Sequence, residues 1–268
     1  MLTKELLDKA PELKILAYSA GSVKNMVSDE LWKREVIVTT GAQSLGVSVA
    51  EYTLGLIVTS LTRVYQTSRQ TARGLWRVDS EINLVKGMHK QVIGIVGAGF
   101  VGRHLMKLLQ NFDIDILLYD PLISESEAQD IGTKKVDLEF LIKSSDLISL
   151  HAPSIPETDN MINKDNLKLM KENAILINTA RGSLINETDL CEALKSQKIF
   201  ALLDVTEPEP PSPDSPLLKM DNAIITPHIA GKGSDKRLGQ YAVDELERFF
   251  QNKPNKYVVK REMLESIA

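Results

Sequence analysis

The sequence contains few of the residues that mark exported, cross-linked or nucleic-acid-binding proteins. Its one cysteine, Cys191, cannot form an internal disulfide, which fits a reducing cytoplasm. The net charge is -4 and no stretch concentrates Lys and Arg, which argues against nucleic acid and anionic lipid as partners. No run approaches the roughly 18 apolar residues of a membrane span, and the charged N-terminal pattern MLTKELLDKAPELK does not resemble a signal peptide. We expect a cytoplasmic protein without nucleic-acid or membrane partners.

The remaining composition is that of a globular chain. Of its 268 residues 43% are hydrophobic and 25% are charged, which is enough to bury one large core or two modest ones. Histidine is scarce, with four in the chain, so the search for a proton donor is short. We expect two domains, and we assign no metal-binding residue.

From Gln91 onward, short apolar runs rich in β-branched residues alternate with helical patterns. Continuous apolar strands between helices are typical of a parallel sheet that is covered on both faces. The pattern therefore predicts an α/β fold with a doubly wound parallel sheet. The expected strands are QVIGIVG, DILLYD, DLISLHAP, AILINTA, IFALLDV and AIITPH.

A smaller domain is expected from the two ends of the chain. LKILAYSAG and EVIVTT read as two more strands, and SVAEYTLGLIVTSLT predicts a helix over 48–62 that is apolar nearly all round and therefore buried. SDKRLGQYAVDELERFFQNKP predicts an amphipathic helix that is stopped by Pro254 and returns the chain to the first domain. We expect one domain from residues 1–45 and 232–268, and a larger one from residues 46–231.

The segment IGIVGAGFVGRHL contains Gly97, Gly99 and Gly102 in the order G-x-G-x-x-G, directly after a strand and at the start of a helix. Such glycines allow a tight turn, close approach of a pyrophosphate and close packing of helix on strand. The next strand ends in Asp120, 18 residues after Gly102, where a carboxylate accepts both ribose hydroxyls of NAD and repels the 2′-phosphate of NADP. The pattern predicts NAD binding. A turn without a ligand and a SAM-binding domain are the alternatives.

Ligands of an open α/β sheet bind beyond the carboxyl ends of its strands. The residues found there are Gly97, Asp120, His151, Arg181, Asp204 and His228. His228 precedes the small-residue hinge IAG at the expected domain boundary, where a cleft would lie. We favour it as the proton donor over His151, which precedes Ala152 and is expected to border the cofactor.

A hydride donor beside a 2-oxo acid needs a cation for the carboxylate, an acid for the forming alkoxide and a group that tunes the acid. Arg181 has a planar guanidinium that fits a carboxylate with two hydrogen bonds. His228 can protonate the oxygen near neutral pH, and a carboxylate on its other nitrogen would hold its tautomer and favour its charged form. Glu207 and Glu209 in the loop EPEPPSPDSP compete for that role, and spacing alone does not choose between them.

Six motifs together resemble the NAD-dependent D-isomer-specific 2-hydroxyacid dehydrogenases, which include D-3-phosphoglycerate, D-lactate and glyoxylate/hydroxypyruvate enzymes. In order they are IGIVGAGFVGR, LLYDP, LHAPSIPET, INTARGSLIN, ALLDVTEPEP and ITPHIAG. The resemblance implies a Rossmann NAD-binding domain and a flavodoxin-like substrate domain. It also implies hydride transfer between NAD(H) and C2 of a small D-2-hydroxy or 2-oxo acid, with Arg181, Glu209 and His228 as catalytic residues. The family's glutamate is the fifth residue after Asp204, which selects Glu209.

The resemblance assigns binding residues as well. The cofactor contacts that it implies are Gly97, Gly99, Phe100, Val101, Gly102, Asp120, Ala152, Thr179 and Asp204, the last of them to the nicotinamide carboxamide. Arg181 and the backbone of Gly21 and Ser22 would hold the substrate carboxylate. The apolar helix over 48–62 and the arm TSRQTARGLWR resemble the family's dimerisation elements, which implies a homodimer.

The chain departs from the family pattern at two places. Phe100 stands where many members carry Arg, so we expect one pyrophosphate contact to be lost. Family members begin with a strand-helix-strand segment before the part that resembles LKILAYSAG, and at least one such unit of roughly 30 residues is expected to be absent. We therefore expect a truncated substrate domain with an exposed sheet edge or a substituted strand.

An NAD(H)-responsive binding protein with little turnover is the alternative, because the same family includes transcriptional corepressors on this fold. The combination of Arg181, Glu209 and His228 favours the enzyme, since a binder has no chemical need for all three. Formate dehydrogenase, on the same fold, would carry Gln in place of Glu209. The sequence does not select one 2-hydroxy acid.

Overall fold

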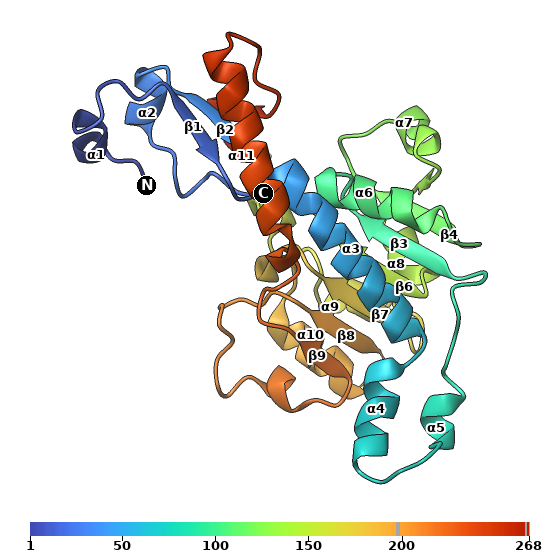
Figure 1. The fold of residues 1–268 in the computed structure, drawn as a ribbon. Coiled ribbons are helices and arrows are strands. Elements are labelled where there is room, and N and C mark those ends of the chain that lie inside the picture. Colours follow the sequence, from blue (N-terminus) through green and yellow to red (C-terminus); the bar gives the residue numbers. More distant parts are fainter. Residues whose placement is uncertain (197–198, 266, 268) are drawn as a thin grey trace. The chain divides into compact units, whose positions relative to one another are not determined.

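The computed structural model describes residues 1–196, 199–265 and 267, and the chain divides into two compact units (Figure 1). The terminal unit comprises Met1–Ser48 and Gly231–Ala268, and the central unit comprises Val49–Ala230. The central unit is therefore an insertion in the terminal unit. The first connection lies inside helix α3 (Ala42–Leu61), and the second precedes helix α11 (Asp235–Phe250).

The central unit is built on a seven-stranded sheet in which every neighbouring pair is parallel. In spatial order the strands are β5 (Lys134–Lys135), β4 (Asp115–Tyr119), β3 (Val92–Val96), β6 (Leu147–Leu150), β7 (Ile175–Asn178), β8 (Phe200–Leu203) and β9 (Ala223–Ile225). The predicted doubly wound parallel sheet is confirmed. The sequence did not predict β5, because a strand of two residues leaves no periodic pattern.

Both faces of this sheet are buried, which explains why its strands read as continuous apolar runs. Successive residues of β7 point to opposite faces: Leu176 packs in one core cluster with Leu141, and Ile177 packs in the other with Leu105. The α-helices of this unit besides α3 are α4 (Val64–Ala72), α5 (Asp79–Ile82), α6 (Phe100–Leu109), α7 (Glu125–Asp130), α8 (Leu138–Ser144), α9 (Lys164–Leu167) and α10 (Glu187–Ser196), and its 3₁₀ helices are η1 (Pro156–Thr158), η2 (Gly182–Leu184) and η3 (Pro216–Lys219). In Figure 1, α4 and α5 project away from the sheet as an arm.

Helix α3 begins six residues before the expected Ser48 and ends at Leu61. By length and composition alone it could cross a membrane, although half of its apolar window is buried in the protein. The sequence did not predict this result, because Glu51 interrupts the apolar run of α3. The core helix of a water-soluble protein passes the same test, so the result is weak evidence.

The terminal unit has a sheet in the order β1 (Ile15–Tyr18), β2 (Ile37–Thr40) and β10 (Val258–Val259). β1 and β2 are parallel, and β10 is an antiparallel third strand that the sequence did not predict. Among the described residues β1 has a neighbouring strand on one side only, which is the first of the two alternatives expected, an open edge or a substituted strand.

The core of the terminal unit is small. The other helices here are α1 (Lys4–Asp8), α2 (Asp29–Lys33), η4 (Lys232–Ser234) and η5 (Arg261–Glu265). α2 begins at the cap residue Ser28, whose hydroxyl accepts from the backbone N–H of Leu31 at 3.3 Å. α11 packs against β1, and the buried residues of the cluster are Leu7, Val23, Val27, Leu31, Val36, Val38 and Val259.

Candidate active site

The predicted site residues follow the strands of the central sheet. They are Gly97 after β3, Asp120 after β4, His151 after β6, Arg181 after β7, Asp204 after β8 and His228 after β9. Because these strands are all parallel, their carboxyl ends share one edge of the sheet, which is where ligands of such sheets bind.

The loop between β3 and α6 contains three glycines, of which the fold requires two and does not require the third. Gly97 has a φ of +101°, and a Cβ there would lie 2.7 Å from the carbonyl carbon of His151. A Cβ on Gly102 would lie 2.1 Å from the carbonyl oxygen of Gly97. A Cβ on Gly99 would meet no described atom within 4 Å, so protein packing does not explain this glycine. A ligand that approaches the backbone closely, as the NAD pyrophosphate does, would explain it.

The start of α6 also fits an anionic group. Gly99 is the N-cap residue and its helix end has no side-chain cap, so the first amide groups are left to a ligand. Phe100 follows with 52% of its side chain exposed, and Val101 packs partly into the core. An exposed phenyl ring cannot donate a hydrogen bond to a phosphate, which agrees with the expected loss of one pyrophosphate contact.

Asp120 holds the glycine loop in place. Its Oδ2 accepts from the backbone N–H of Ala98 at 2.7 Å, and its Oδ1 accepts from that of Leu122 at 2.8 Å. Each carboxylate oxygen can accept a second hydrogen bond. Asp120 can therefore fix the loop and still accept from ribose hydroxyls, as the sequence predicts.

His151 lies against the glycine loop rather than on an acidic partner. Its Nε2 is 2.9 Å from the hydroxyl of Ser149. Burial lowers the pKa of His151 from 6.5 to about 3, so the ring is neutral near neutral pH. The neighbouring Ala152 is buried and its backbone borders Gly97. These facts fit the expectation that His151 borders the cofactor and is not the proton donor.

The loop after β7 has a shape that requires particular residues. The buried side chain of Asn178 donates to the carbonyl of Arg181 at 2.8 Å and accepts from the N–H of Ala180 at 3.0 Å. A Cβ on Gly182 would lie 2.1 Å from the carbonyl carbon of Thr206, so only glycine fits there. Asn178 and Gly182 were not among the predicted site residues, although the glycine directly after Arg181 is a visible signal.

The Arg181 guanidinium is held at the base of this loop. Its Nη1 donates to the carbonyl of Ala180 at 2.6 Å. Burial lowers the pKa of Arg181, and the nearby carboxylate of Glu209 opposes this change. A partly desolvated guanidinium with remaining donors suits a substrate carboxylate.

Glu209 is the loop acid that contacts His228. Its Oε1 lies 2.6 Å from Nδ1 of His228, and the two side chains are 44% and 50% exposed. The contact leaves the Nε2 nitrogen of His228 to face a ligand. Between the two acids that sequence spacing left open, this geometry favours Glu209 over Glu207.

Asp204 lies under the turn that carries His228. It is 1% exposed, and its carboxylate accepts from Thr226 Oγ1 at 2.6 Å and from the N–H groups of Ile229 and Ala230 at 2.9 and 2.8 Å. The resemblance assigns Asp204 to the nicotinamide carboxamide. In the structure its carboxylate binds the protein's own backbone.

Three other residues predicted to contact cofactor or substrate are Thr179, Gly21 and Ser22. Thr179 is buried, and its hydroxyl is 3.0 Å from that of Thr53 on α3. Gly21 and Ser22 belong to the terminal unit, and the Gly21 carbonyl accepts from the hydroxyl of Thr40. The assignment of these residues to cofactor and substrate stays a prediction.

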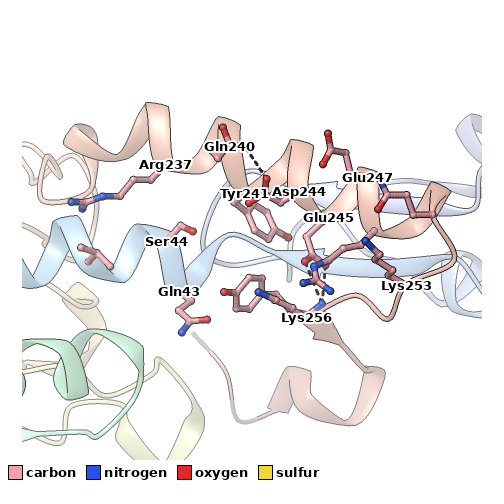
Figure 2. A pocket seen from close by; sticks show the side chains of 14 residues that line it. Gln43, Ser44, Arg237, Gln240, Tyr241, Asp244, Glu245, Glu247, Lys253 and Lys256 are labelled. Carbon is pink, nitrogen blue, oxygen red and sulfur yellow. Dashed lines mark hydrogen bonds between the residues drawn. The ribbon is translucent and has the colours of Figure 1, made fainter.

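A groove of about 600 Å³ lies in the terminal unit, between α11 and the start of α3, and none of the predicted site residues lines it (Figure 2). Several of its polar groups bond to one another: Glu245 accepts from Asn255 and Lys256, and Gln240 donates to Asp244. Across the described ranges, no three His, Cys, Asp or Glu side chains are grouped to hold a metal.

Residues 54–230 match the family described as D-isomer specific 2-hydroxyacid dehydrogenase, NAD binding domain. The chain belongs to this family. The family resemblance inferred from six motifs is confirmed, and the matched residues are those of the family's NAD-binding domain.

Named relatives of this 2-hydroxyacid dehydrogenase family member differ in substrate and length. A glyoxylate reductase of Thermococcus litoralis is 37% identical over 243 residues, which are 88% of this chain and 73% of that protein. A D-3-phosphoglycerate dehydrogenase of Archaeoglobus fulgidus is 34% identical over 235 residues, which are 87% of this chain and 44% of that protein. The chain thus spans less than half the length of the latter relative.

Solved structures of this family share the fold. A D-lactate dehydrogenase with NAD+ from Lactobacillus jensenii has a TM-score of 0.83 at 25% identity and covers 96% of this chain and 81% of its own. An NAD-dependent formate dehydrogenase in complex with NAD from Staphylococcus aureus has a TM-score of 0.74 at 32% identity, with 96% and 78% covered.

Proposed function

We propose that this chain transfers a hydride between NAD(H) and C2 of a small 2-oxo acid, with the D-2-hydroxy acid as the reduced product. The contact of His228 with Glu209 at 2.6 Å, near the partly buried Arg181, carries the proposal. His228, Glu209 and Arg181 all follow strands at one edge of the sheet, and this reaction needs a proton donor, a carboxylate partner for that donor and a cation for the substrate carboxylate. Relatives named glyoxylate reductase and hydroxypyruvate reductase support the same substrate class.

In the proposed reaction each residue has one task. The bound NADH supplies the hydride. Arg181 binds the substrate carboxylate through its guanidinium, which orients C2 and its carbonyl oxygen. His228 donates a proton from Nε2 to that oxygen, while Glu209 accepts the hydrogen on Nδ1 and stabilises the charged ring. The reverse reaction returns the proton to Nε2.

The two units have separate roles in this proposal. The central unit binds NAD through the glycine loop and Asp120. The terminal unit contributes the backbone of Gly21 and Ser22 to substrate binding. A cytoplasmic location belongs to the proposal, because the one cysteine, Cys191, is a buried free thiol.

A homodimer is also proposed, with the α4–α5 arm as the interface. In the segment between these helices Leu75 is 52% exposed and Trp76 is 79% exposed. Large exposed apolar side chains of this kind are typical of contact surfaces. Light scattering should give twice the chain mass, and Trp76→Ser should shift the protein to the monomer. Leu122→Ser, at a side chain that is 82% exposed on α7's preceding loop, is the matched control and should leave the mass unchanged.

The experiment that tests the reaction follows NADH absorbance with pyruvate, glyoxylate, hydroxypyruvate, 2-oxoisocaproate and phosphohydroxypyruvate. Turnover that is lost in Arg181→Ala would support the dehydrogenase and rank the substrates. NADH binding without turnover of any of these acids would instead favour the NAD(H)-responsive binding protein.

A further inference from the structure

The turn that carries His228 has a backbone that needs support. His228 has a φ of +50°, a backbone conformation that residues other than glycine adopt at a cost in free energy. Its N–H donates to the carbonyl of Asp204 at 2.9 Å. The next two amides, of Ile229 and Ala230, donate to the Asp204 carboxylate. The position of the imidazole therefore depends on how Asp204 is held.

The hydroxyl of Thr226 connects Asp204 to a more distant residue. It lies 2.6 Å from Oδ1 of Asp204, and because a carboxylate only accepts, Thr226 must donate its single proton there. Thr226 can then only accept from its other neighbour, the hydroxyl of Tyr52 on α3 at 3.0 Å. Burial raises the pKa of Tyr52, so this hydroxyl keeps its proton and can donate. The direction of both hydrogen bonds is thereby determined.

We propose that Tyr52 and Thr226 are positioning residues for proton transfer. They act through Asp204 to hold the His228 ring where it contacts Glu209 and can reach the substrate. This inference rests on the proposed reaction. Neither residue touches the reacting atoms. Both are more than 20 residues from Asp204 along the chain, with Tyr52 on a helix and Thr226 directly after β9, so the rigid sheet and α3 together set the turn.

A double-mutant cycle tests the relay, because coupled residues lose their effect together and independent ones do not. Thr226→Val removes a hydrogen bond to a charged group and should lower kcat about tenfold or more, with the KM of the 2-oxo acid nearly unchanged. Tyr52→Phe should lower kcat about threefold. The double variant should equal Thr226→Val, since without the hydroxyl of Thr226 the tyrosine has nothing to orient. Effects that multiply would overturn the relay.

Two matched variants control for damage to the fold. Thr226→Ser keeps the hydroxyl and should restore the rate. Tyr65→Phe removes a tyrosine hydroxyl that accepts from Thr59 at 3.2 Å and takes no part in the hydrogen bonds from Tyr52 to Thr226 and from Thr226 to Asp204, so it should leave the rate unchanged. A rate loss in Tyr65→Phe equal to that in Tyr52→Phe would contradict the relay.

Amide hydrogen exchange provides a readout without turnover. Thr226→Val should speed exchange at Ile229 and Ala230, whose amides donate to Asp204, and Tyr52→Phe should do so to a smaller extent. If the wild type reduces none of the acids, the proposed reaction fails and the exchange rates still test the relay. Unchanged exchange at both amides would overturn it.

Discussion

Two histidines at the same sheet edge have opposite environments. His151 follows β6, near the middle of the sheet, where its ring meets a serine hydroxyl and burial keeps it neutral. His228 follows β9, the last strand of the order, where its ring is half exposed and rests on the carboxylate of Glu209. Of the two rings, only that of His228 has a carboxylate as its hydrogen-bond partner. Partner and depth, rather than residue type, distinguish a proton donor from a structural histidine.

Replacing each histidine in turn should give the largest difference in kcat between the two positions. We expect His228→Gln to lower kcat for 2-oxo acid reduction roughly a thousandfold, because the forming alkoxide loses its proton donor. NADH binding, measured by fluorescence, should stay nearly unchanged. His151→Gln should change kcat by less than about threefold, since a neutral ring is not a proton donor at neutral pH. Equal losses in the two variants would remove the assigned difference.

A methyl group added at Gly182 should disturb the loop that carries Arg181. In Gly182→Ala the new Cβ clashes with the backbone of Thr206, so we expect a loss of about 2 kcal/mol in the free energy of unfolding, together with lower kcat/KM because the Arg181 loop moves. Urea unfolding measures the first effect. Gly55→Ala, on α3 where a Cβ meets no described atom within 4 Å, is the control and should stabilise the protein by about 0.5 kcal/mol.

Removing the hydrogen-bond partner of each histidine should also affect kcat differently at the two positions. Glu209→Gln keeps the shape of the side chain and removes its charge, so kcat should fall roughly tenfold or more as the charged imidazole becomes less stable. Ser149→Ala removes the hydroxyl next to His151 and should leave kcat within about twofold. Steady-state rates at saturating NADH decide the matter, and a larger loss in Ser149→Ala would reverse our assignment.

The smallest expected effect is on stability at mildly acidic pH. Because the pKa of His151 is lowered to about 3 in the folded protein, the unfolded chain binds the extra proton between that value and 6.5. The stabilisation from a neutral His151 is therefore complete above pH 6.5 and is lost as the pH falls towards 3. Between pH 6 and pH 5 the wild type should lose about 1 kcal/mol more than His151→Gln in urea unfolding.

Local patterns predicted most of the central unit. The six longer strands, the glycine loop and its acid are contiguous stretches whose periodicity and turn residues are visible in the sequence. The contacts that complete the site join distant segments instead. Gly182 is required by Thr206, and Thr226 is oriented by Tyr52, which lies 174 residues away. Sequence spacing alone therefore left Glu207 and Glu209 unresolved, because a long loop can bring either acid to His228.

The insertion of one unit in the other determines the order in which the protein can fold during synthesis. Val49–Ala230 is one continuous segment, so its sheet can form as soon as that segment has left the ribosome. The terminal unit must wait, because β2 pairs with β10 through Thr39 and Val258, and α11 is among the last elements to be made. Once residue 230 has been made, the sequence of the central unit is complete, while β1 and β2 of the terminal unit still lack their third strand, β10.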